Sequence, residues 1–274
     1  ASLTTGIGVR VHTPHTFAFL FDAMFSAPKR YLFRRIEAHY ARRTHRLIAV
    51  SEGEAETMIS SGVVSAAGVR VVPNGIDMNL WGNIKPVCRE SIGVPKDAIM
   101  VLVAGLLNSA KGQDLAIQAL SQARLQNLFL VLAGHGDELV ALERLSATLG
   151  VADRVRFLGW RSDVPALVAA ADIVLLPSRW EGMPYVVLEA MASGKPVLAT
   201  KVDGARELIL PGETGFLVDV QDTAAMAAGL DQLALLSPQT RANYGERGAA
   251  RIRAGYQIDH MVRATQEVFA EALG

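Results

Sequence analysis

Short apolar runs alternate with helical patterns between about residues 99 and 218, and this alternation most constrains the fold. Strands are expected at 99–104, 128–132, 155–158, 173–176, 197–199 and 215–218. The connections are short, and helical patterns fill the intervals, as after Lys111-Gly112 and from Asp163 onward. Strands that alternate with helices in this way predict parallel β-α-β units with right-handed crossovers. We therefore expect an α/β fold.

The residues before position 77 follow the same plan less regularly. Strands are expected at 9–15, 47–50 and 69–72, and a helix at 28–43, where Leu32, Ile36 and Tyr40 recur at a spacing of four. Ser51 and Glu54 match a capping box, which predicts that a second helix begins there. Prolines and glycines without a clean period at 76–96 indicate a linker between two domains. Two helices are expected to close the chain, at 238–254 and 259–273.

The composition argues against several classes of protein. The 27 Lys and Arg residues equal the 27 Asp and Glu residues in number, which argues against a dedicated nucleic-acid binder. Cys88 is the only cysteine, so a disulfide within the chain is impossible, which fits a reducing compartment. No apolar run approaches the ~20 residues of a transmembrane helix, and the first residues have no signal-peptide pattern.

The stretch from Ser178 to Val197 carries two carboxylates, Glu181 and Glu189. Pro184 can open a helix between them, because a proline at the first helical position gives up only an N–H that has no partner there. Gly194 then ends that helix. This order places Glu181 at the carboxyl end of a strand, where open α/β sheets bind ligands. Two carboxylates suit a polyol ligand, and the alternative is two solvated surface carboxylates.

Small and polar residues follow several of the expected strands. Residues 105–112, 134–136, Gly159 and 181–184 would lie along one edge of the sheet, where helix N-termini present free N–H groups and a positive dipole end. This edge suits a diphosphate, and Lys111 adds a full charge. The alternative is that β-α turns use glycine for structural reasons. A dinucleotide fingerprint is incomplete, because Leu139 stands where its last glycine is required.

His15 stands where the first expected strand breaks. A histidine there can act as an acid, a base or a hydrogen-bond donor, and a structural role is the alternative. The sequence contains no motif for a metal site and no Gly-x-Ser-x-Gly for a serine nucleophile. We therefore expect neither a metal nor a cofactor.

Five motifs together resemble a known family. They are Val72-Pro73-Asn74-Gly75-Ile76-Asp77, Lys111-Gly112, Gly134-His135-Gly136, the Glu-x7-Glu run from Glu181 to Glu189, and Gly212-Glu213-Thr214-Gly215. In this order they resemble a retaining glycosyltransferase of the GT-B fold, family 4 (glycosyl transferases group 1), over nearly the whole chain.

The resemblance implies two Rossmann-like domains with parallel sheets. An incomplete N-terminal domain, at 1–77, would bind the acceptor, and a linker would follow at 78–96. The C-terminal domain, at 97–254, would bind the nucleotide sugar. The last helix, at 255–274, would return toward the N-terminal domain.

The resemblance also implies a role for each site residue. Glu181 and His15 are the expected catalytic residues, because Glu181 would hold hydroxyls of the donor sugar and His15 would reach that sugar from the acceptor side. Lys111 would neutralise the diphosphate, and Glu189 would bind the ribose. Backbone groups would complete the donor site at Gly105, Gly134, Gly136, Gly182, Met183 and Pro184.

The implied reaction is transfer of a sugar from a nucleotide-sugar donor of the UDP or GDP type, with retention at the anomeric carbon and without a metal. It is of the hexosyltransferase type, and a lipid-linked or polysaccharide glycan is the expected acceptor. Lys111 and helix N-termini would steady the leaving diphosphate. We expect a cytoplasmic enzyme, peripheral on the inner face of the membrane, with no nucleic-acid partner.

Two departures from the family's pattern leave alternatives open. Leu106 stands where the family usually has an arginine, so one diphosphate cation is missing unless Asn108, Ser109 or a basic residue from elsewhere substitutes. The family's N-terminal domain normally begins earlier, so we expect a truncated chain. The alternatives are a non-catalytic nucleotide-binding fragment and a GT-B nucleotide-sugar epimerase.

The helix expected at 28–43 lies in a strongly basic segment. Lys29, Arg30, Arg34, Arg35, Arg42, Arg43 and Arg46 flank its apolar positions. This pattern indicates contact with an anionic membrane or a phosphorylated lipid acceptor. A solvated helix face is the alternative.

Overall fold

The computed structural model describes residues 8–15, 17–21, 25–82 and 84–274. The chain forms two compact units. The first comprises Ala1–Gly75, Glu181–Met183 and Ile258–Gly274, and the second comprises Ile76–Trp180 and Pro184–Gln257. In the described part of the chain, no helix combines the length and the apolar character that crossing a bilayer requires.

The first unit contains a parallel sheet in the order β1-β2-β3, formed by β1 (Val11–His12), β2 (Arg46–Ala49) and β3 (Val69–Val71). Its helices are α1 (Ala27–Ala41), α2 (Glu52–Ser60) and α10 (Ile258–Leu273).

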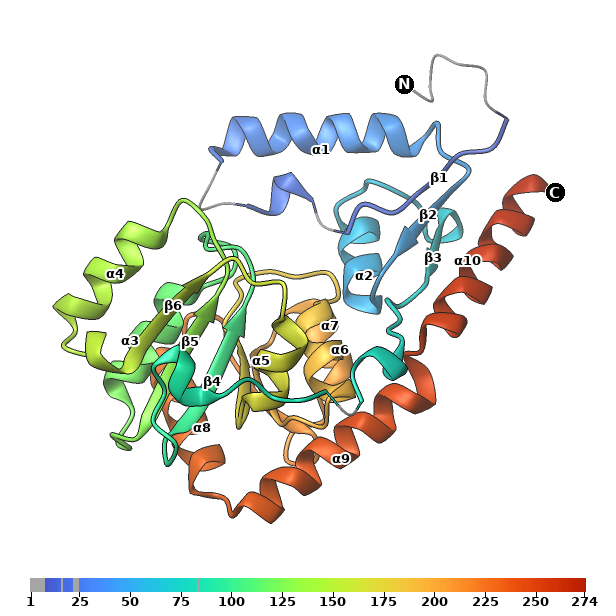
Figure 1. The fold of residues 1–274 in the computed structure, drawn as a ribbon. Coiled ribbons are helices and arrows are strands. Elements are labelled where there is room, and N and C mark those ends of the chain that lie inside the picture. The colour runs from blue at the N-terminus through green and yellow to red at the C-terminus, as the bar shows by residue number, and fades with distance from the viewer. Residues whose placement is uncertain (1–7, 16, 22–24, 83) are drawn as a thin grey trace. The chain divides into compact units, whose positions relative to one another are not determined.

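The two faces of this sheet are covered by different helices, because successive side chains of a strand point to opposite sides. Leu47 and Ala49 of β2 enter a core with Met58 of α2. Ile48, between them, enters a smaller core with Val268 of α10. The two helices therefore lie on opposite faces of the sheet (Figure 1).

The capping box expected at Ser51 begins α2 as predicted. The Ser51 hydroxyl accepts a hydrogen bond from the Glu54 N–H over 3.1 Å. The Glu54 carboxylate accepts from the N–H of Val50 over 2.7 Å. Both residues are buried, so the helix start is a fixed part of the core.

The second unit contains a parallel sheet in the order β6-β5-β4-β7-β8-β9. Its strands are β4 (Ile99–Ala104), β5 (Leu128–Ala133), β6 (Val155–Gly159), β7 (Ile173–Leu176), β8 (Val197–Thr200) and β9 (Gly215–Val218). The chain runs outward from β4 to β6 and then returns to the other side of β4 as β7. This reversal is the point at which doubly wound sheets bind ligands.

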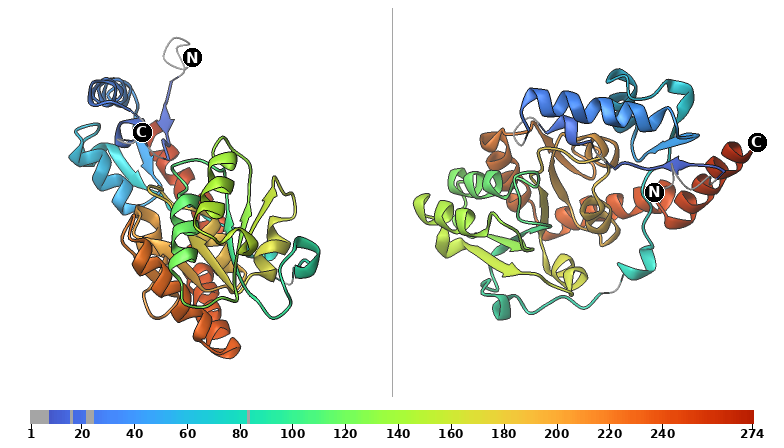
Figure 2. Two further views of the ribbon diagram at one scale, coloured as in Figure 1. Left: turned by 90° about the vertical axis from the view of Figure 1, so that its left-hand side faces the viewer. Right: turned by 90° about the horizontal axis from the view of Figure 1, so that it is seen from above.

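Helices cover both faces of the second sheet (Figure 2). One core joins the strands to α3 (Gln113–Gln122), α4 (Leu139–Thr148) and α8 (Thr223–Leu235). The remaining helices of this unit are α5 (Val164–Ala170), α6 (Tyr185–Ala192), α7 (Asp203–Leu208) and α9 (Pro238–Gly255). Helix α6 packs against both α5 and α9.

The predicted α/β class with two parallel sheets is confirmed, and every expected strand is present. The sequence did not predict α7 or α8. The residues expected to form a linker belong to the second unit and contain two short 3₁₀ helices, Met78–Leu80 and Arg89–Ile92. Arg89 forms an ion pair with Asp172, 2.9 Å away.

Candidate functional site

Four loops meet at the carboxyl edge of the second sheet, because β4 to β7 are parallel neighbours. Gly105 and Lys111 follow β4, and Gly134 and Gly136 follow β5. The loops after β4 and β5 are joined by backbone hydrogen bonds: Gly105 N–H donates to Ala133 O over 3.0 Å, and Leu107 N–H donates to His135 O over 2.8 Å. Four of the predicted site residues therefore share one rigid edge.

Gly134 and Gly136 have a structural reason to be glycine. A Cβ atom on Gly134 would lie 1.8 Å from the carbonyl oxygen of Gly105, and one on Gly136 would lie 2.1 Å from that of Leu107. Any side chain would separate the two loops. Close packing of the loops explains these glycines without a ligand, as the alternative reading of the sequence proposed.

Lys111 precedes the N-terminus of α3. Gly112 caps this helix in the left-handed conformation, with φ at +67°. A Cβ atom on Gly112 would lie 2.1 Å from the Pro177 carbonyl oxygen, so only glycine fits there. The stem of Lys111 runs along Gly105, since its Cδ and Cε atoms lie 3.9 Å from where a Cβ on that glycine would stand. A cation and a helix N-terminus are thus neighbours at this edge.

An ion pair that the sequence did not reveal braces the loop after β4. Arg179, in the loop after β7, binds both carboxylate oxygens of Asp114, at 2.9 and 2.6 Å, and donates to the Ser109 carbonyl over 2.7 Å. The hydrogen bonds with Asp114 raise the pKa of Arg179. Because its guanidinium is engaged in this way, Arg179 fixes the loop after β4. Its partners are distant in sequence, so no local pattern could identify it.

Asn108 and Ser109, the other suggested substitutes, also shape this loop. The Asn108 side-chain oxygen accepts from the Lys111 N–H over 3.1 Å. The Leu106 carbonyl accepts from the Gln113 side chain over 2.9 Å, while the Leu106 side chain is exposed. Local hydrogen bonds thus hold the backbone of the loop in one conformation.

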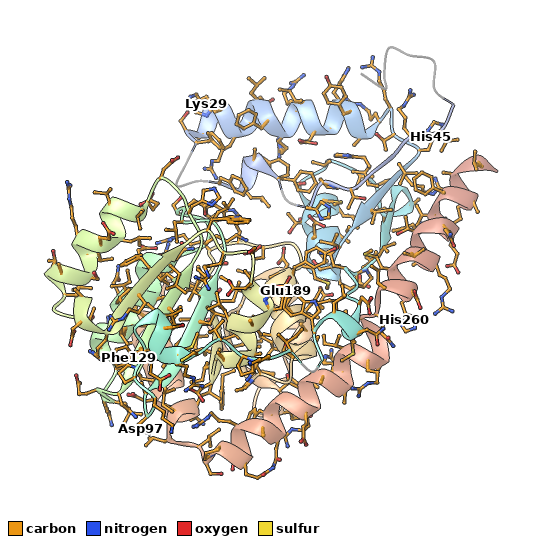
Figure 3. All side chains as sticks on the ribbon, in the orientation of Figure 1. Lys29, His45, Asp97, Phe129, Glu189 and His260 are labelled. Atoms are coloured by element: carbon orange, nitrogen blue, oxygen red, sulfur yellow. The ribbon has the colours of Figure 1, made fainter. Side chains whose placement is uncertain are left out.

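Helix α6 carries the second predicted carboxylate. Pro184 stands at its N-cap position, and the helix begins at Tyr185, one residue later than the proline suggested. Gly194 follows the helix in the left-handed conformation, as predicted. Glu189 lies on the second turn (Figure 3), and its burial raises the pKa of the carboxyl group to about 7. A group with this pKa changes its charge near neutral pH.

We expect the stability of the protein to depend on pH through Glu189. The folded state binds the proton more tightly than the unfolded chain, whose pKa is near 4.5. The free energy of unfolding should therefore fall as pH rises from about 4.5 to about 7. The wild type should therefore lose stability relative to Glu189→Gln between pH 5 and pH 8. Urea unfolding of both proteins at the two pH values measures this change.

Glu143→Gln, which changes an exposed carboxylate on α4, is the matched control. Equal changes with pH in the two variants would contradict a special role of Glu189.

The remaining predicted residues lie in the first unit, where the segment Glu181–Met183 packs with the N-terminal residues. The buried side chain of Asn74 donates a hydrogen bond to the Met183 carbonyl over 3.0 Å. A Cβ atom on Gly182 would lie 2.4 Å from the His15 carbonyl oxygen and 2.9 Å from a methyl carbon of Val50. His15 itself adopts the left-handed conformation, with φ at +62°.

The ten predicted site residues thus fall into two groups. Lys111, Gly105, Gly134, Gly136, Pro184 and Glu189 belong to the second unit. His15, Glu181, Gly182 and Met183 belong to the first. Within each unit the structure brings together Lys111 with Gly105, and His15 with Gly182. Asn74, which the sequence indicated only as part of the motif from Val72 to Asp77, binds the Met183 carbonyl in the first unit.

Two protein families match the chain. The family described as glycosyl transferases group 1 matches residues 85–251, and the family described as glycosyltransferase family 4 matches residues 3–80.

Two curated relatives match a large part of the chain. The lipopolysaccharide core biosynthesis glycosyltransferase LpsE of Rhizobium meliloti (strain 1021) is 32% identical over 209 residues, which are 76% of this chain and 59% of LpsE. The UDP-Gal:alpha-D-GlcNAc-diphosphoundecaprenol alpha-1,3-galactosyltransferase of Escherichia coli is 27% identical over 230 residues, 81% of this chain and 59% of that protein. The chain therefore spans about three fifths of the length of these relatives.

A solved structure also resembles the chain. The crystal structure of HepE from Anabaena, in complex with UDP and glucose, matches with a TM-score of 0.86 and 28% identity. The match covers 95% of this chain and 71% of HepE.

Proposed function

Because the chain belongs to the glycosyl transferases group 1 family and has the GT-B arrangement of two Rossmann-like parallel sheets, we propose that it takes part in sugar transfer from a nucleotide-sugar donor. The observation that carries the proposal is the carboxyl edge of the second sheet. There Lys111 and the N-terminus of α3 provide a cation and free N–H groups for a diphosphate. Glu189 provides a carboxylate for ribose hydroxyls.

The proposed reaction retains the anomeric configuration and uses neither a metal nor a cofactor. The bond from the anomeric carbon to the phosphate oxygen breaks, and a bond to the acceptor oxygen forms on the same face of the sugar. The acceptor proton passes to the leaving phosphate oxygen. Lys111 and the α3 N-terminus stabilise the charge that develops on the diphosphate. Glu181 holds hydroxyls of the donor sugar, and His15 approaches that sugar from the acceptor side.

The similarity to HepE supports a UDP-sugar as the first donor to test, with GDP-sugars as the second. The Escherichia coli relative is named as a galactosyltransferase for a diphosphoundecaprenol-linked sugar, which supports a lipid-linked or polysaccharide glycan as the acceptor. LpsE, named for lipopolysaccharide core biosynthesis, supports a place in polysaccharide biosynthesis.

The decisive experiment incubates the protein with radiolabelled UDP-, GDP- and ADP-sugars and candidate glycan acceptors. Transfer of label to an acceptor supports the proposal. Nucleotide binding without turnover would replace it with a non-catalytic binding role, and interconversion of the free nucleotide sugars would replace it with epimerisation. The anomeric configuration of the product, read by NMR, tests retention, and activity in EDTA tests metal independence.

We further propose that the protein works at the cytoplasmic face of a membrane. The basic helix α1 supports this location, since Lys and Arg side chains are attracted to the anionic lipids of the cytoplasmic leaflet. Sedimentation with vesicles of phosphatidylcholine, with and without phosphatidylglycerol, tests it. Failure to sediment with the anionic vesicles would remove membrane contact from the proposal and leave the transfer reaction untouched.

A further inference from the structure

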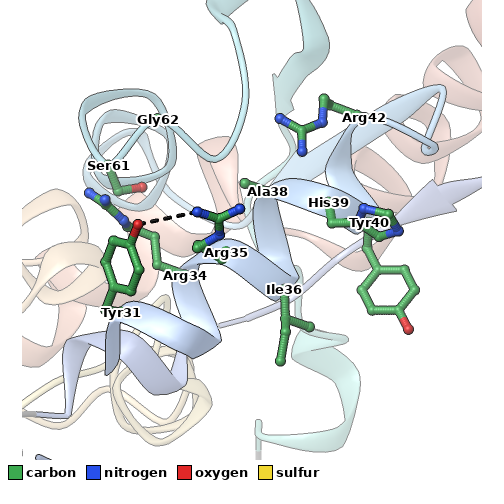
Figure 4. Close-up of a pocket in the computed structure, with 10 residues that line it drawn as sticks. All are labelled: Tyr31, Arg34, Arg35, Ile36, Ala38, His39, Tyr40, Arg42, Ser61 and Gly62. Atoms are coloured by element: carbon green, nitrogen blue, oxygen red, sulfur yellow. Dashed lines mark hydrogen bonds between the residues drawn. The ribbon is translucent and has the colours of Figure 1, made fainter. Parts of the chain in front are cut away.

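A groove of about 840 Å³ lies along α1 in the first unit. Side chains of α1 form most of it, and Ser61 and Gly62, at the end of α2, complete it (Figure 4). A volume of this size is typical of sites for small organic ligands. None of the residues assigned to the proposed donor site lines it.

The groove is strongly cationic. Arg34, Arg35 and Arg42 line it, and none of the ten lining residues is a carboxylate. This local excess stands out because the whole chain has a net charge of zero. An anionic ligand is therefore the occupant that the charges favour.

Two of these arginines converge on one tyrosine. The guanidinium carbons of Arg34 and Arg35 lie 5.6 and 5.9 Å from the centre of the Tyr31 ring. Arg35 also donates a hydrogen bond to the Tyr31 hydroxyl over 3.3 Å, and this bond lowers the pKa of the tyrosine (Figure 4). Two guanidinium groups beside one tyrosine concentrate positive charge in the groove, and this charge favours an anion. Guanidinium groups bind phosphate through paired N–H donors, so a phosphate is the anion that best fits.

An apolar stripe borders the cationic groove. Leu32, Ile36 and Tyr40 follow one another at a spacing of four along α1, and their side chains are 55%, 40% and 48% exposed. Ile36 and Tyr40 also line the groove. The sequence pattern predicted the helix correctly, but these apolar residues lie outside the core. A cationic groove beside exposed apolar side chains fits an amphiphile whose polar group is phosphorylated.

We propose that this groove binds the phosphate or diphosphate group of a lipid-linked acceptor, and that Leu32, Ile36 and Tyr40 contact its apolar chain. The inference rests on the proposed function, because it assigns the acceptor's anchoring group to a place on the protein. It adds a binding site that is separate from the donor residues and names the chemical class of its ligand.

The first test uses inorganic pyrophosphate as the probe, titrated calorimetrically into protein that carries Lys111→Gln, which removes the cation of the proposed donor site. The double variant R34Q/R35Q should weaken pyrophosphate binding by about tenfold or more, because it removes charge-assisted hydrogen bonds. Lys29→Gln, which removes one positive charge from α1 outside the groove, should alter binding by less than about twofold, as expected for a screened surface charge.

An unchanged affinity for pyrophosphate in the double variant, or an equal loss in Lys29→Gln, would contradict the proposal that this groove binds phosphate. Both arginines are exposed, and an unchanged melting temperature shows that the double variant still folds.

The second test identifies the source of the phosphate. Phosphatidylcholine vesicles that carry a polyprenyl diphosphate are compared with phosphatidylcholine vesicles that carry enough phosphatidylglycerol to give the same surface charge. The inference predicts stronger binding to the polyprenyl diphosphate, competition by pyrophosphate, and loss in R34Q/R35Q. If the protein bound both kinds of vesicle equally, and Lys29→Gln lost as much binding as R34Q/R35Q, a general attraction to anionic membranes would explain the binding and the proposed site would be contradicted.

The two proposals fail separately. Pyrophosphate binding in the groove does not require sugar transfer, so a protein that binds pyrophosphate there but transfers no sugar would contradict only the proposed function. If R34Q/R35Q transferred sugar with an unchanged KM for the acceptor, only the proposed acceptor-phosphate site in the groove would be contradicted.

Discussion

Replacing Glu181 with glutamine should lower kcat/KM for sugar transfer by about 10²- to 10³-fold, the range found when a group that stabilises a transition state is removed. The proposed carboxylate accepts hydrogen bonds from hydroxyls of the donor sugar, and an amide is a weaker acceptor with no charge. UDP lacks that sugar. The affinity of Glu181→Gln for UDP, measured by calorimetry, should therefore stay within about twofold of the wild-type value, because the removed interaction does not involve the nucleotide.

The matched control is Glu213→Gln. Glu213 is exposed and belongs to the Gly212-Glu213-Thr214-Gly215 turn of the second unit, so it carries the same change of charge outside the proposed site. Its transfer rate should match that of the wild type. If Glu181→Gln transferred sugar as fast as Glu213→Gln, the assignment of Glu181 to the donor sugar would be wrong. If Glu181→Gln lost UDP binding as well, the residue would act on the structure of the site instead.

The strands of the second sheet could be predicted because both faces of that sheet are covered by helices. Strands buried on both faces are continuous apolar runs, such as 99–104 and 128–132, and glycine turns bound them. The missed helices lack the pattern that identifies a helix. Helix α7 has only six residues. Helix α8 has alanine, methionine and leucine all around it, so apolar and polar residues do not alternate with a helical period.

The predicted site shows a different limit. The sequence identified which residues lie at strand ends, because that depends on local order along the chain. It could not say whether Gly134 is needed for a ligand or for packing, since the answer depends on the Gly105 carbonyl, which approaches it from another strand. The pair of Arg179 and Asp114 is invisible for the same reason: the two residues are 65 positions apart.

The segment Glu181–Met183 illustrates this limit most clearly. Its sequence predicts only a loop between a strand and a helix, and the predicted boundaries assign it to the domain at 97–254. The structure packs it with the N-terminal unit, where Asn74, 109 positions away, binds its backbone. No pattern within the segment indicates that partner. The proposed sugar-binding carboxylate is thus held by the unit that also carries His15.

Gly182→Ala should therefore impair sugar transfer about 100-fold or more, although alanine is the smallest possible side chain. Its Cβ atom would lie 2.4 Å from the His15 carbonyl oxygen, 2.9 Å from a Val50 methyl carbon and 3.3 Å from a Glu54 carboxylate oxygen. The hydrogen bond from Asn74 to Met183 holds the other end of the segment, so the loop must shift as a whole. A displacement of about 1 Å in a positioning group can cost 10²-fold in rate.

The stability of Gly182→Ala should also fall, by about 1–3 kcal/mol, as is typical of overpacking a buried position. Gly255→Ala is the control, because nothing lies within 4 Å of a Cβ atom added there. Transfer rates and urea unfolding curves of the two variants separate the effects. Loss of transfer in a variant that remains folded and binds UDP normally supports the view that the N-terminal unit positions Glu181. Normal transfer by Gly182→Ala would contradict it, because the loop could then move without affecting the reaction.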